Sequence, residues 1–428
     1  MRIICSILII FCVTGCKDSK APVARYEDYE RYISSTQLVS DESFHEEVKF
    51  WNSRLAKNGK DEASLSKLAG LYAELFKKTG TVGHILHSDS LNREILKQYP
   101  HGNAEIYQRL AANAITQHKF QDAKKYAETA LRLKEKEAAS LLLLVDVSIE
   151  TGDLAKANQI LRKFRNKNSF AYLIRKAKVY DHDGLLDSAI VSMEKAYERI
   201  KGNRVLGQWA LSNLGDMYGH AGKIEKAYQT YLNVLKNNPS DDHALQGIAW
   251  ICLSDDKNFE AAKRIINALS IRRHMPEAHL MYAEIAEMEG DERLKLKHLK
   301  KFRQLVSDPA YKIMYHKYLA LLEAEEFNPE VAVSIATKEI ANRPAPASYD
   351  LLAWAYYHQK DFIKAFKVAK SQVENQTFEP DAIYHLGMIY LANGDKSQAK
   401  HYLEEALESE FELGPSVSAA IKKALKSL

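Results

Sequence analysis

Leu211-Ser-Asn-Leu214-Gly215-Asp-Met-Tyr218 is the stretch that decides the fold of this 428-residue chain. A second stretch reads almost the same, Ile383-Tyr-His-Leu386-Gly387-Met-Ile-Tyr390. After each stretch a glycine and an alanine follow at the same distances, Gly222 and Ala227 in one case and Gly394 and Ala399 in the other. A unit of about 34 residues returns nine times in this way. Such a period predicts a stacked repeat array, in which no unit can bury its apolar face alone.

The register of the repeat is set by a small residue in the second half of each unit. These positions are Ala123, Ala157, Ala189, Ala227, Ala261, Lys295, Ala332, Ala365 and Ala399. Twelve residues before each lies another site that is usually small: Ala111, Val145, Ala177, Gly215, Ala249, Ala283, Ala320, Ala353 and Gly387. Two such positions let two helices approach closely as an antiparallel pair. Only Lys295 breaks the rule in the second half, so we expect the loosest packing around it.

Each half of a unit has helical periodicity, because apolar residues recur at steps of three and four, as in Leu211, Leu214 and Tyr218. Five of the nine turns between halves contain glycine: Gly152, Gly184, Gly222, Gly290 and Gly394. Three of these are followed by a capping aspartate: Asp153, Asp291 and Asp395. Prolines mark the joints between units: Pro100, Pro239, Pro276, Pro309, Pro346 and Pro380. The pattern predicts an all-α fold with nine helix pairs over residues 104–413.

These residues resemble the tetratricopeptide repeat, which is matched best at Leu211–Pro239 and Ile383–Leu407. The resemblance covers roughly three quarters of the chain and repeats many times over. It implies a right-handed superhelical solenoid of antiparallel helix pairs, with a concave inner face built mostly from the first helix of each pair. It implies no single activity.

The N-terminus has the composition of an export signal. Met1-Arg2 is a positive start, Ile3–Val13 is an apolar run too short to span a bilayer, and small residues follow. The sequence Val13-Thr14-Gly15-Cys16 resembles the bacterial lipobox, which implies a lipoprotein signal peptide over residues 1–15 and a diacylglyceryl group on Cys16. An ordinary secretory signal with a chance cysteine is the alternative. The lipobox reading places the chain in a bacterial cell envelope, and Lys17 agrees with the outer membrane, on its periplasmic side or at the surface.

The cysteines support export without a disulfide. Cys5 and Cys12 leave with the signal, and lipidation would occupy Cys16, so Cys252 remains alone. Its position in a first helix favours a buried, small apolar residue over a reactive thiol.

Three segments flank the repeats. Residues 16–40 are predicted to be the lipidated cysteine and a tether, in which Tyr26, Tyr29 and Tyr32 begin an early helix. Residues 41–103 are predicted to form N-terminal helices and a degenerate repeat, with an insertion around Thr79 to Asp89. Gly414-Pro415 ends the last pair, and residues 414–428 are predicted to form a capping helix. Binding of that amphipathic helix to a membrane is the alternative.

Composition and motifs bear on the function class. Without Arg2 the chain has 59 basic and 56 acidic residues, too balanced for an electrostatic nucleic-acid binder. We find no phosphate-binding loop, no catalytic triad signature and no metal motif, so we expect no enzyme, cofactor or metal. Asp181-His-Asp183-Gly184 resembles a calcium loop only faintly, and a plain helix turn is favoured. His84 and His87 have no third ligand within sequence reach.

Aromatic and polar residues are predicted to line the groove. They follow the small contact sites or share their stripe on the first helices: Trp209, Asp216, His220, His243, Trp250, Asp350, Trp354, Tyr357, His358 and Tyr384. A tryptophan there suits a peptide or a sugar face. The alternative is that these rings only pack between units. Capture of a free carboxylate end is disfavoured, because Ser212, Asp216, Asp350 and Trp354 replace the basic groove residues that it requires.

The sequence therefore favours a lipid-anchored scaffold or adaptor that binds a protein or peptide partner of unknown identity in its groove. A glycan- or nutrient-binding surface lipoprotein is the alternative, although the units leave little room for inserted sugar-binding loops. An enzyme is the third class, and the missing motifs oppose it.

Overall fold

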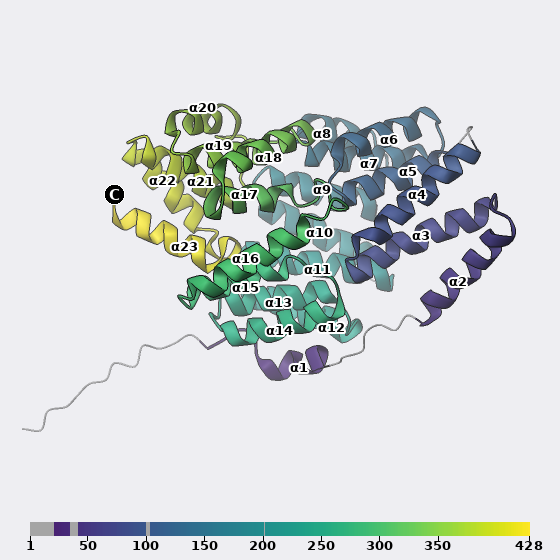
Figure 1. The fold of residues 1–428 in the computed structure, drawn as a ribbon, viewed down its shortest axis with the longest axis horizontal. Coiled ribbons are helices and arrows are strands. Elements are labelled where there is room, and N and C mark those ends of the chain that lie inside the picture. The colour runs from purple at the N-terminus through teal and green to yellow at the C-terminus, as the bar shows by residue number, and fades with distance from the viewer. Residues whose placement is uncertain (1–20, 35–41, 100–102, 201) are drawn as a thin grey trace, which may run out of the picture.

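The computed structural model of the chain describes residues 21–34, 42–99, 103–200 and 202–428. Within these residues the chain forms 23 helices and no strand, which confirms the all-α prediction. Helices that follow one another pack as pairs, and the pairs stack into a curved solenoid (Figure 1). The predicted signal peptide, Cys16 and the joint at Pro100 lie outside the described residues.

Nine helix pairs occupy the predicted repeat region. They are α5 (Ala104–Thr116) with α6 (Phe120–Arg132), α7 (Glu137–Glu150) with α8 (Leu154–Arg162), α9 (Phe170–His182) with α10 (Leu186–Ile200), α11 (Arg204–His220) with α12 (Ile224–Asn237), α13 (Asp242–Ser254) with α14 (Phe259–Arg272), α15 (Ala278–Met288) with α16 (Glu292–Val306), α17 (His316–Glu326) with α18 (Pro329–Asn342), α19 (Pro346–His358) with α20 (Phe362–Gln372), and α21 (Pro380–Ala392) with α22 (Lys396–Leu407). Five further helices flank them: α1 (Tyr26–Ser34), α2 (Glu42–Lys57), α3 (Glu62–Thr79), α4 (Val82–Gln98) and α23 (Glu410–Lys426).

The turns between paired helices have the predicted chemistry. All five turn glycines adopt a left-handed conformation, with φ between 67° and 86°. In three of the other turns His118, Lys257 and Lys360 take that conformation instead. The carboxylates of the three predicted capping aspartates accept a hydrogen bond from the backbone of the next helix. Each turn thus ends one helix and starts its antiparallel partner within a few residues.

Small residues allow the close helix approach that the repeat predicts. Most of the alanines at the second-half site are fully buried, and Ala261 is 7% exposed. A Cβ atom on Gly215 would lie 2.4 Å from the Tyr231 ring, and one on Gly387 would lie 2.7 Å from Leu403. Lys295 instead reaches two carboxylates, with Nζ 2.6 Å from Glu326 and 3.3 Å from Glu287.

The degenerate unit before the repeats is a complete pair, α3 with α4. Since α4 begins at Val82, the predicted insertion over Thr79 to Asp89 is wrong. Gly80 explains the short connection, because its left-handed conformation (φ 68°) ends α3 and lets the next helix start at once. A Cβ atom on Gly80 would lie 2.0 Å from the carbonyl oxygen of His274, and the His274 amide donates to Thr79 O at 2.8 Å.

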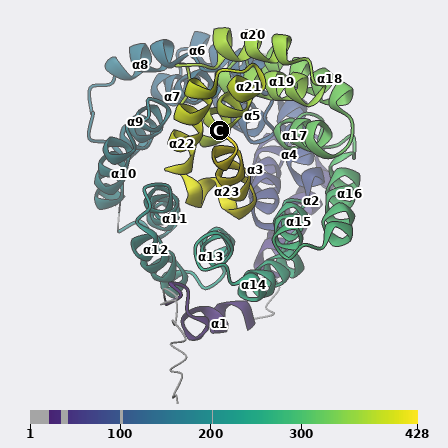
Figure 2. The ribbon, with the colours of Figure 1, turned by 90° about the vertical axis from the view of Figure 1, so that its left-hand side faces the viewer.

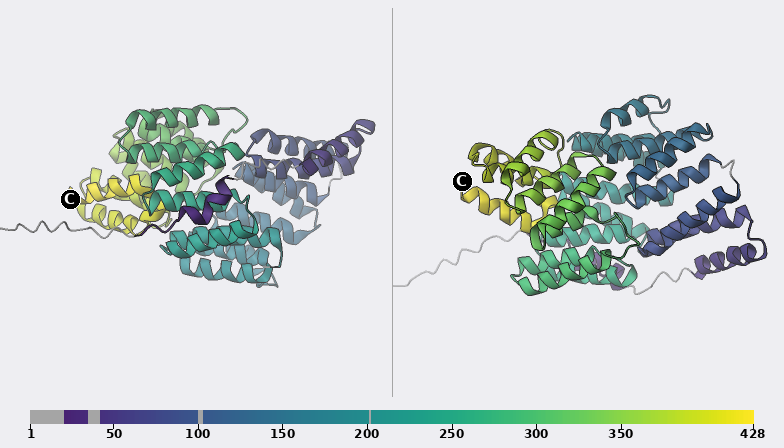
Figure 3. Two further views of the ribbon diagram at one scale, coloured as in Figure 1. Left: turned by 90° about the horizontal axis from the view of Figure 1, so that it is seen from below. Right: turned by 45° about the horizontal axis from the view of Figure 1, so that its top comes forward.

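The solenoid curves far enough for its later pairs to touch its earlier ones. Seen from its end, the molecule forms a ring of helix pairs (Figure 2). Asn342 at the end of α18 joins the two parts: its side chain accepts from the Phe120 amide (3.0 Å) and donates to His118 O (2.8 Å). Arg343 lies 3.9 Å from Glu150 across the same seam. The helices α2 to α4 and α21 to α23 lie towards opposite ends of the long axis (Figure 3).

The described part of the predicted tether is folded onto the repeats. Helix α1 packs against the outer helices α12 and α14, and Tyr29 and Tyr32 are buried there. The Val23 amide donates to Asp256 at 2.7 Å and the Arg25 amide to Tyr228 at 3.0 Å. The free Cys252 is fully buried, which confirms the prediction of a buried, small apolar residue, and burial raises the pKa of its thiol to about 12.

Candidate functional site

The candidate site is a row of equivalent positions that we call the inner stripe: Asp216 on α11, Trp250 on α13 and Glu284 on α15. Each directly follows a small contact residue, namely Gly215, Ala249 or Ala283. Because the contact residue faces the paired helix, its neighbour turns towards the inside of the curved solenoid. Four residues further along the same helices lie His220 and Ser254, one helical turn away.

The inner stripe is occupied by the chain itself. We define the C-terminal segment as residues 409–418, which includes the first turns of α23. The Trp250 indole Nε1 and the Ser254 hydroxyl both donate to the main-chain oxygen of Phe411, each at 2.8 Å. The Ser416 amide donates to Glu284 Oε1 at 3.1 Å. Helix α23 contacts α11, α13 and α15, and it lies inside the ring in Figure 2.

Two glycines make room for this contact. A Cβ atom on Gly219 of α11 would lie 2.7 Å from the Phe411 ring. Gly414 has φ 81° and ψ 173°, a conformation that is open essentially only to glycine, and it divides α23 into two helical parts. A Cβ atom on Gly414 would lie 2.8 Å from Glu284 and 3.0 Å from Trp250. The last pair ends at Leu407 and α23 begins at Glu410, earlier than the capping helix predicted from residue 414, and the kink at Gly414 seats the segment on the inner stripe.

The environment of the inner stripe shifts the pKa values of Glu284 and of His243. Burial raises the pKa of Glu284 above its usual value, and its hydrogen bond with Ser416 acts against that rise. The hydroxyl of Tyr231 on α12 donates to Asp216 on α11 at 2.6 Å, and His243 Nε2 on α13 lies 2.7 Å from the other oxygen of Asp216. Burial alone would lower the pKa of His243, but Asp216 raises it.

A second group, the distal aromatic cluster, lies on α19 and α21: Trp354, Tyr357, His358, Tyr384 and His385. Trp354 is only 3% exposed, and its indole nitrogen donates to Glu325 at 2.7 Å. Its ring stacks on His385, with ring centres 3.9 Å apart, and on Tyr357 at 4.6 Å. The prediction that Trp354 lies on an exposed inner surface is therefore corrected, because the neighbouring repeat covers the ring.

A buried ion pair supports the distal aromatic cluster. His385 Nδ1 lies 2.9 Å from Asp350 Oδ2, and both residues are buried. Burial alone would lower the pKa of His385, but Asp350 raises it. Burial, together with the charge on His385, lowers the pKa of His358 to about 4. Asp350 thus holds His385 under the indole ring and is a buried structural residue.

The remaining predicted residues, Trp209 and His220, lie apart from the distal aromatic cluster, on α11. Trp209 is 40% exposed, and its ring meets Phe170 edge to face with centres 6.0 Å apart. His220 lies 3.6 Å from Glu412 of the C-terminal segment. The sequence prediction missed Ser254, Glu284, Glu325 and Phe411. The repeat register, applied to Ala283, would have found Glu284, but no local signal identifies Phe411 as its neighbour.

An acidic cavity of about 390 Å³ opens beside the C-terminal segment. Its lining includes Asp181, His182, His220, Glu379, Glu405, Glu408 and Glu412. Burial raises the pKa of Glu412; His220 opposes this, and the carboxylates Glu379 and Asp381 add to it. The carboxylates around this cavity repel one another, and a positively charged side chain would offset that repulsion. A basic side chain therefore suits the cavity.

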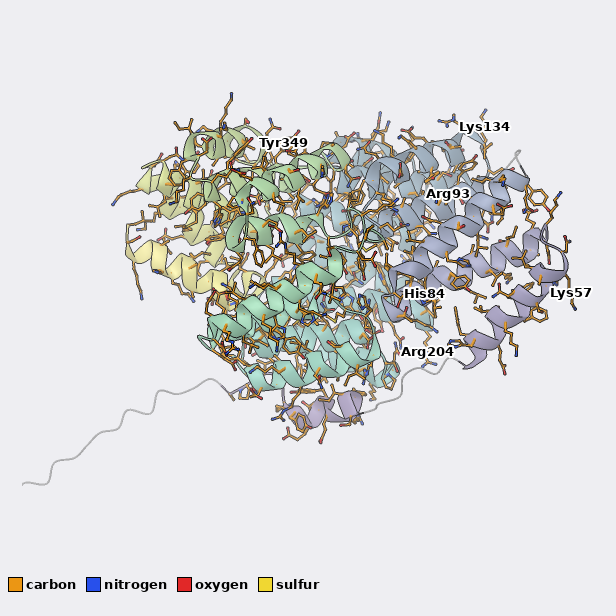
Figure 4. All side chains as sticks on the ribbon, in the orientation of Figure 1. Lys57, His84, Arg93, Lys134, Arg204 and Tyr349 are labelled. Atoms are coloured by element: carbon orange, nitrogen blue, oxygen red, sulfur yellow. The ribbon has the colours of Figure 1, made fainter. Side chains whose placement is uncertain are left out.

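The described residues contain neither a metal-binding cluster nor a membrane-spanning helix. In those residues no group of three or more His, Cys, Asp or Glu side chains is placed to hold a metal ion. His84 on α4, labelled in Figure 4, stacks on Tyr72, and His87 meets the same ring edge to face. Asp181 and His182 end α9, and Asp183 and Gly184 lie in the turn before α10, which agrees with the plain helix turn. No helix in the described part of the chain is long and apolar enough to cross a membrane.

Comparison with known proteins agrees with this architecture. Sequence profiles of the tetratricopeptide repeat match residues 109–171 and 380–412. No curated protein matches the chain in sequence.

Solved structures also resemble the chain. A tetratricopeptide repeat protein from Parabacteroides merdae is 21% identical and aligns over 60% of this chain and 97% of its own, with a TM-score of 0.36. Pseudomonas aeruginosa PilF is 14% identical over 51% and 96% of the two chains, with a TM-score of 0.37. Yeast Tom70 is 13% identical over 94% and 97%, with a TM-score of 0.35.

Proposed function

We propose that this chain, which is a tetratricopeptide-repeat protein, is a lipid-anchored envelope scaffold that holds a protein or peptide partner on its inner face. The repeat fold is that of a scaffold for protein–protein interaction. The anchor, the envelope and the inner face as the binding surface are the proposed parts. They rest on the lipobox-like sequence at Cys16 and on the chemistry of the inner stripe.

The observation that carries the proposal is that the inner stripe holds a polypeptide main chain. Trp250, Ser254 and Glu284 bond to backbone groups of the C-terminal segment, whatever the side chains of that segment are. Side-chain donors and acceptors that satisfy a backbone in an irregular conformation are what a peptide groove must provide. Beyond the covered part, Trp209 remains exposed and available.

The anchor would set which side of the scaffold faces the membrane. Val23 is bonded to Asp256, next to the outer helices α12 and α14. The chain between Cys16 and Val23 can span at most about 25 Å when fully extended. A lipid on Cys16 would therefore keep this outer surface near the bilayer and leave the inner face turned to the partner.

Replacement of Cys16 tests the anchor. In the native host, Cys16→Ser should move the protein from the membrane fraction to the soluble fraction, because stable anchoring needs the acyl chains. Cys252→Ser is the matched control and should stay with the membrane. A Cys16→Ser protein that remains membrane-bound contradicts the lipid anchor.

Site-specific photocrosslinking tests the binding surface. A benzoylphenylalanine at Trp209 on the inner face should capture a polypeptide partner from intact envelopes. The same group at Ile363, which is 80% exposed on the outer helix α20, is the control and should capture less. Equal yields from both positions, or none from Trp209, would contradict a partner on the inner face.

A further inference from the structure

We propose that the C-terminal segment is an internal ligand of the inner stripe, and that a partner segment of the same chemistry displaces it. This inference rests on the proposed function, because it names what the inner face recognises. The required chemistry is an aromatic residue followed three residues later by Gly-Pro, as in Phe411 and Gly414-Pro415.

The hydrogen bonds of the inner face to the C-terminal segment do not depend on the side chains of that segment. Trp250 and Ser254 are one turn apart on α13, and both donate to one carbonyl oxygen, that of Phe411. Glu284 on α15 accepts from the Ser416 amide. All three contacts join side chains of the groove to backbone atoms of the segment. Another segment with the same backbone path can therefore replace it without loss of a hydrogen bond.

Specificity comes from the two glycine contacts. Gly219 leaves the space that the Phe411 ring fills, so an aromatic side chain is selected at that position. Gly414 lies against Trp250 and Glu284, where a side chain would collide. Its backbone conformation is open essentially only to glycine. A displacing segment must reproduce both features.

The two faces of α23 have different roles. Ile421 and Ala424, which follow the C-terminal segment, pack into the cluster that closes α21 and α22 and cap the solenoid, and Leu413 of the segment reaches the same cluster. Phe411 packs instead against the core of α11 to α14 and is only partly buried. A cavity of about 530 Å³ lies beside it, lined by residues that include Ser254, Lys257, Pro415 and Lys422. Opening of the segment would withdraw Phe411 and Leu413, while Ile421 and Ala424 would keep the cap in place.

A synthetic peptide of residues 408–420, labelled with fluorescein, tests displacement in the full-length protein. Phe411→Ala weakens the internal segment but leaves the inner stripe intact. We expect this variant to bind the peptide about tenfold more tightly than the wild type, since truncating a partly buried phenylalanine weakens its competing contact. Leu425→Ala changes the capping face of α23 outside the segment and outside the peptide, and should bind like the wild type.

Two further variants assign the binding to the inner stripe. In the Phe411→Ala background, Trp250→Phe keeps a ring but removes the indole donor, and Glu284→Gln removes the carboxylate. Each should weaken peptide binding several-fold, and a peptide with Phe411→Ala should not bind. A Phe411→Ala protein that keeps its helicity and binds no more peptide than the wild type overturns the proposal.

Hydrogen exchange of the wild type provides a test that requires no variant. If the segment opens locally, the Ser416 amide exchanges faster than the amides in the middle of α21. Exchange of Ser416 only at the rate of global unfolding shows a permanent cap and overturns the proposal. A wild-type dimer that swaps this segment would identify a second copy as the occupant and overturn a separate partner.

The outcomes separate this inference from the proposed function. Peptide exchange uses the purified chain alone, whereas photocrosslinking at Trp209 uses the native envelope. If the peptide displaces the segment but Trp209 captures no partner, the internal ligand is supported and the scaffold role is contradicted. If Trp209 captures a partner but the peptide does not displace the segment, the scaffold role is supported and the internal ligand is contradicted.

Discussion

Trp250 and Trp354 occupy the same position of the repeat, yet the structure gives them different environments. Each directly follows the small contact residue of its first helix, Ala249 or Ala353. Trp250 is partly buried and donates to the backbone of Phe411, 161 residues away. Trp354 is 3% exposed and donates to Glu325, 29 residues away in the preceding repeat.

The difference shows that the repeat register predicts where on its helix a side chain lies, but not which residues bury it. Both indoles follow a small contact residue, but only the Trp250 indole meets the C-terminal segment inside the ring (Figure 2). At Trp354 the cover comes from the next repeat, because His385 stacks on the ring. The Trp250 ring is covered by the C-terminal segment, which lies outside the repeats and is bound by hydrogen bonds to Trp250, Ser254 and Glu284 and by the contact of Phe411 with Gly219. Only the second kind of cover can be exchanged without dismantling a repeat.

The largest expected effect that separates the two sites is on stability. Trp354→Ala should lower the free energy of unfolding by about 3–5 kcal/mol, since it leaves a cavity among packed rings. Trp250→Ala should cost about 1–2 kcal/mol, since it loses one hydrogen bond and partial burial. Urea denaturation followed by circular dichroism measures both. Equal losses would mean that the C-terminal segment is as much a part of the core as the distal aromatic cluster is.

Replacing two glycines, one in the C-terminal segment and one in a repeat turn, should have smaller effects on stability. Gly414 and Gly394 both have positive φ, but only Gly414 has atoms in the place of a Cβ. Gly394→Ala should cost about 1 kcal/mol, from backbone strain alone. Gly414→Ala should cost about 2 kcal/mol, since its backbone region is less accessible and the new methyl group meets Trp250. Denaturation midpoints of the two variants check this order, and a larger loss at Gly394 would refute it.

The sequence predicted the nine pairs because their determinants are local. A turn glycine such as Gly222, followed nine residues later by Tyr231, lies within one unit, and Gly215 is placed to receive that ring. Short-range steric rules therefore suffice for the helix pairs. The insertion near Gly80 was predicted wrongly because the polar side chains of early α4 concealed its helical register.

The candidate site was only partly predictable, because its contacts join distant parts of the chain. The sequence identified Asp216, His243 and Trp250 as residues of the inner face, and the structure joins the first two in one ion pair. The contact of Phe411 with Gly219 depends on how far the whole solenoid curves. That curvature sums small rotations at every joint, and no single residue encodes it.

The smallest effect is a pH dependence that separates the two histidine–aspartate pairs. His385 is buried with Asp350, while the His243 side chain beside Asp216 is 48% exposed. In both cases the aspartate raises the folded-state pKa of the histidine against the opposing effect of burial. Protonation therefore favours the folded state below the unfolded pKa of about 6.5, and this stability is lost as the pH rises through the folded pKa.

Urea midpoints at pH 7 and 8 measure that loss for each variant relative to the wild type. His385→Gln should remove more of the loss than His243→Gln, because solvent screens the exposed pair. His358 acts in the opposite direction below pH 7, because its folded-state pKa of about 4 leaves it neutral in the folded state while the unfolded state binds a proton, so the variants are compared at pH 7 and above. If His243→Gln removes the larger part, the central pair on the inner stripe, and not the distal one, controls the stability of the solenoid.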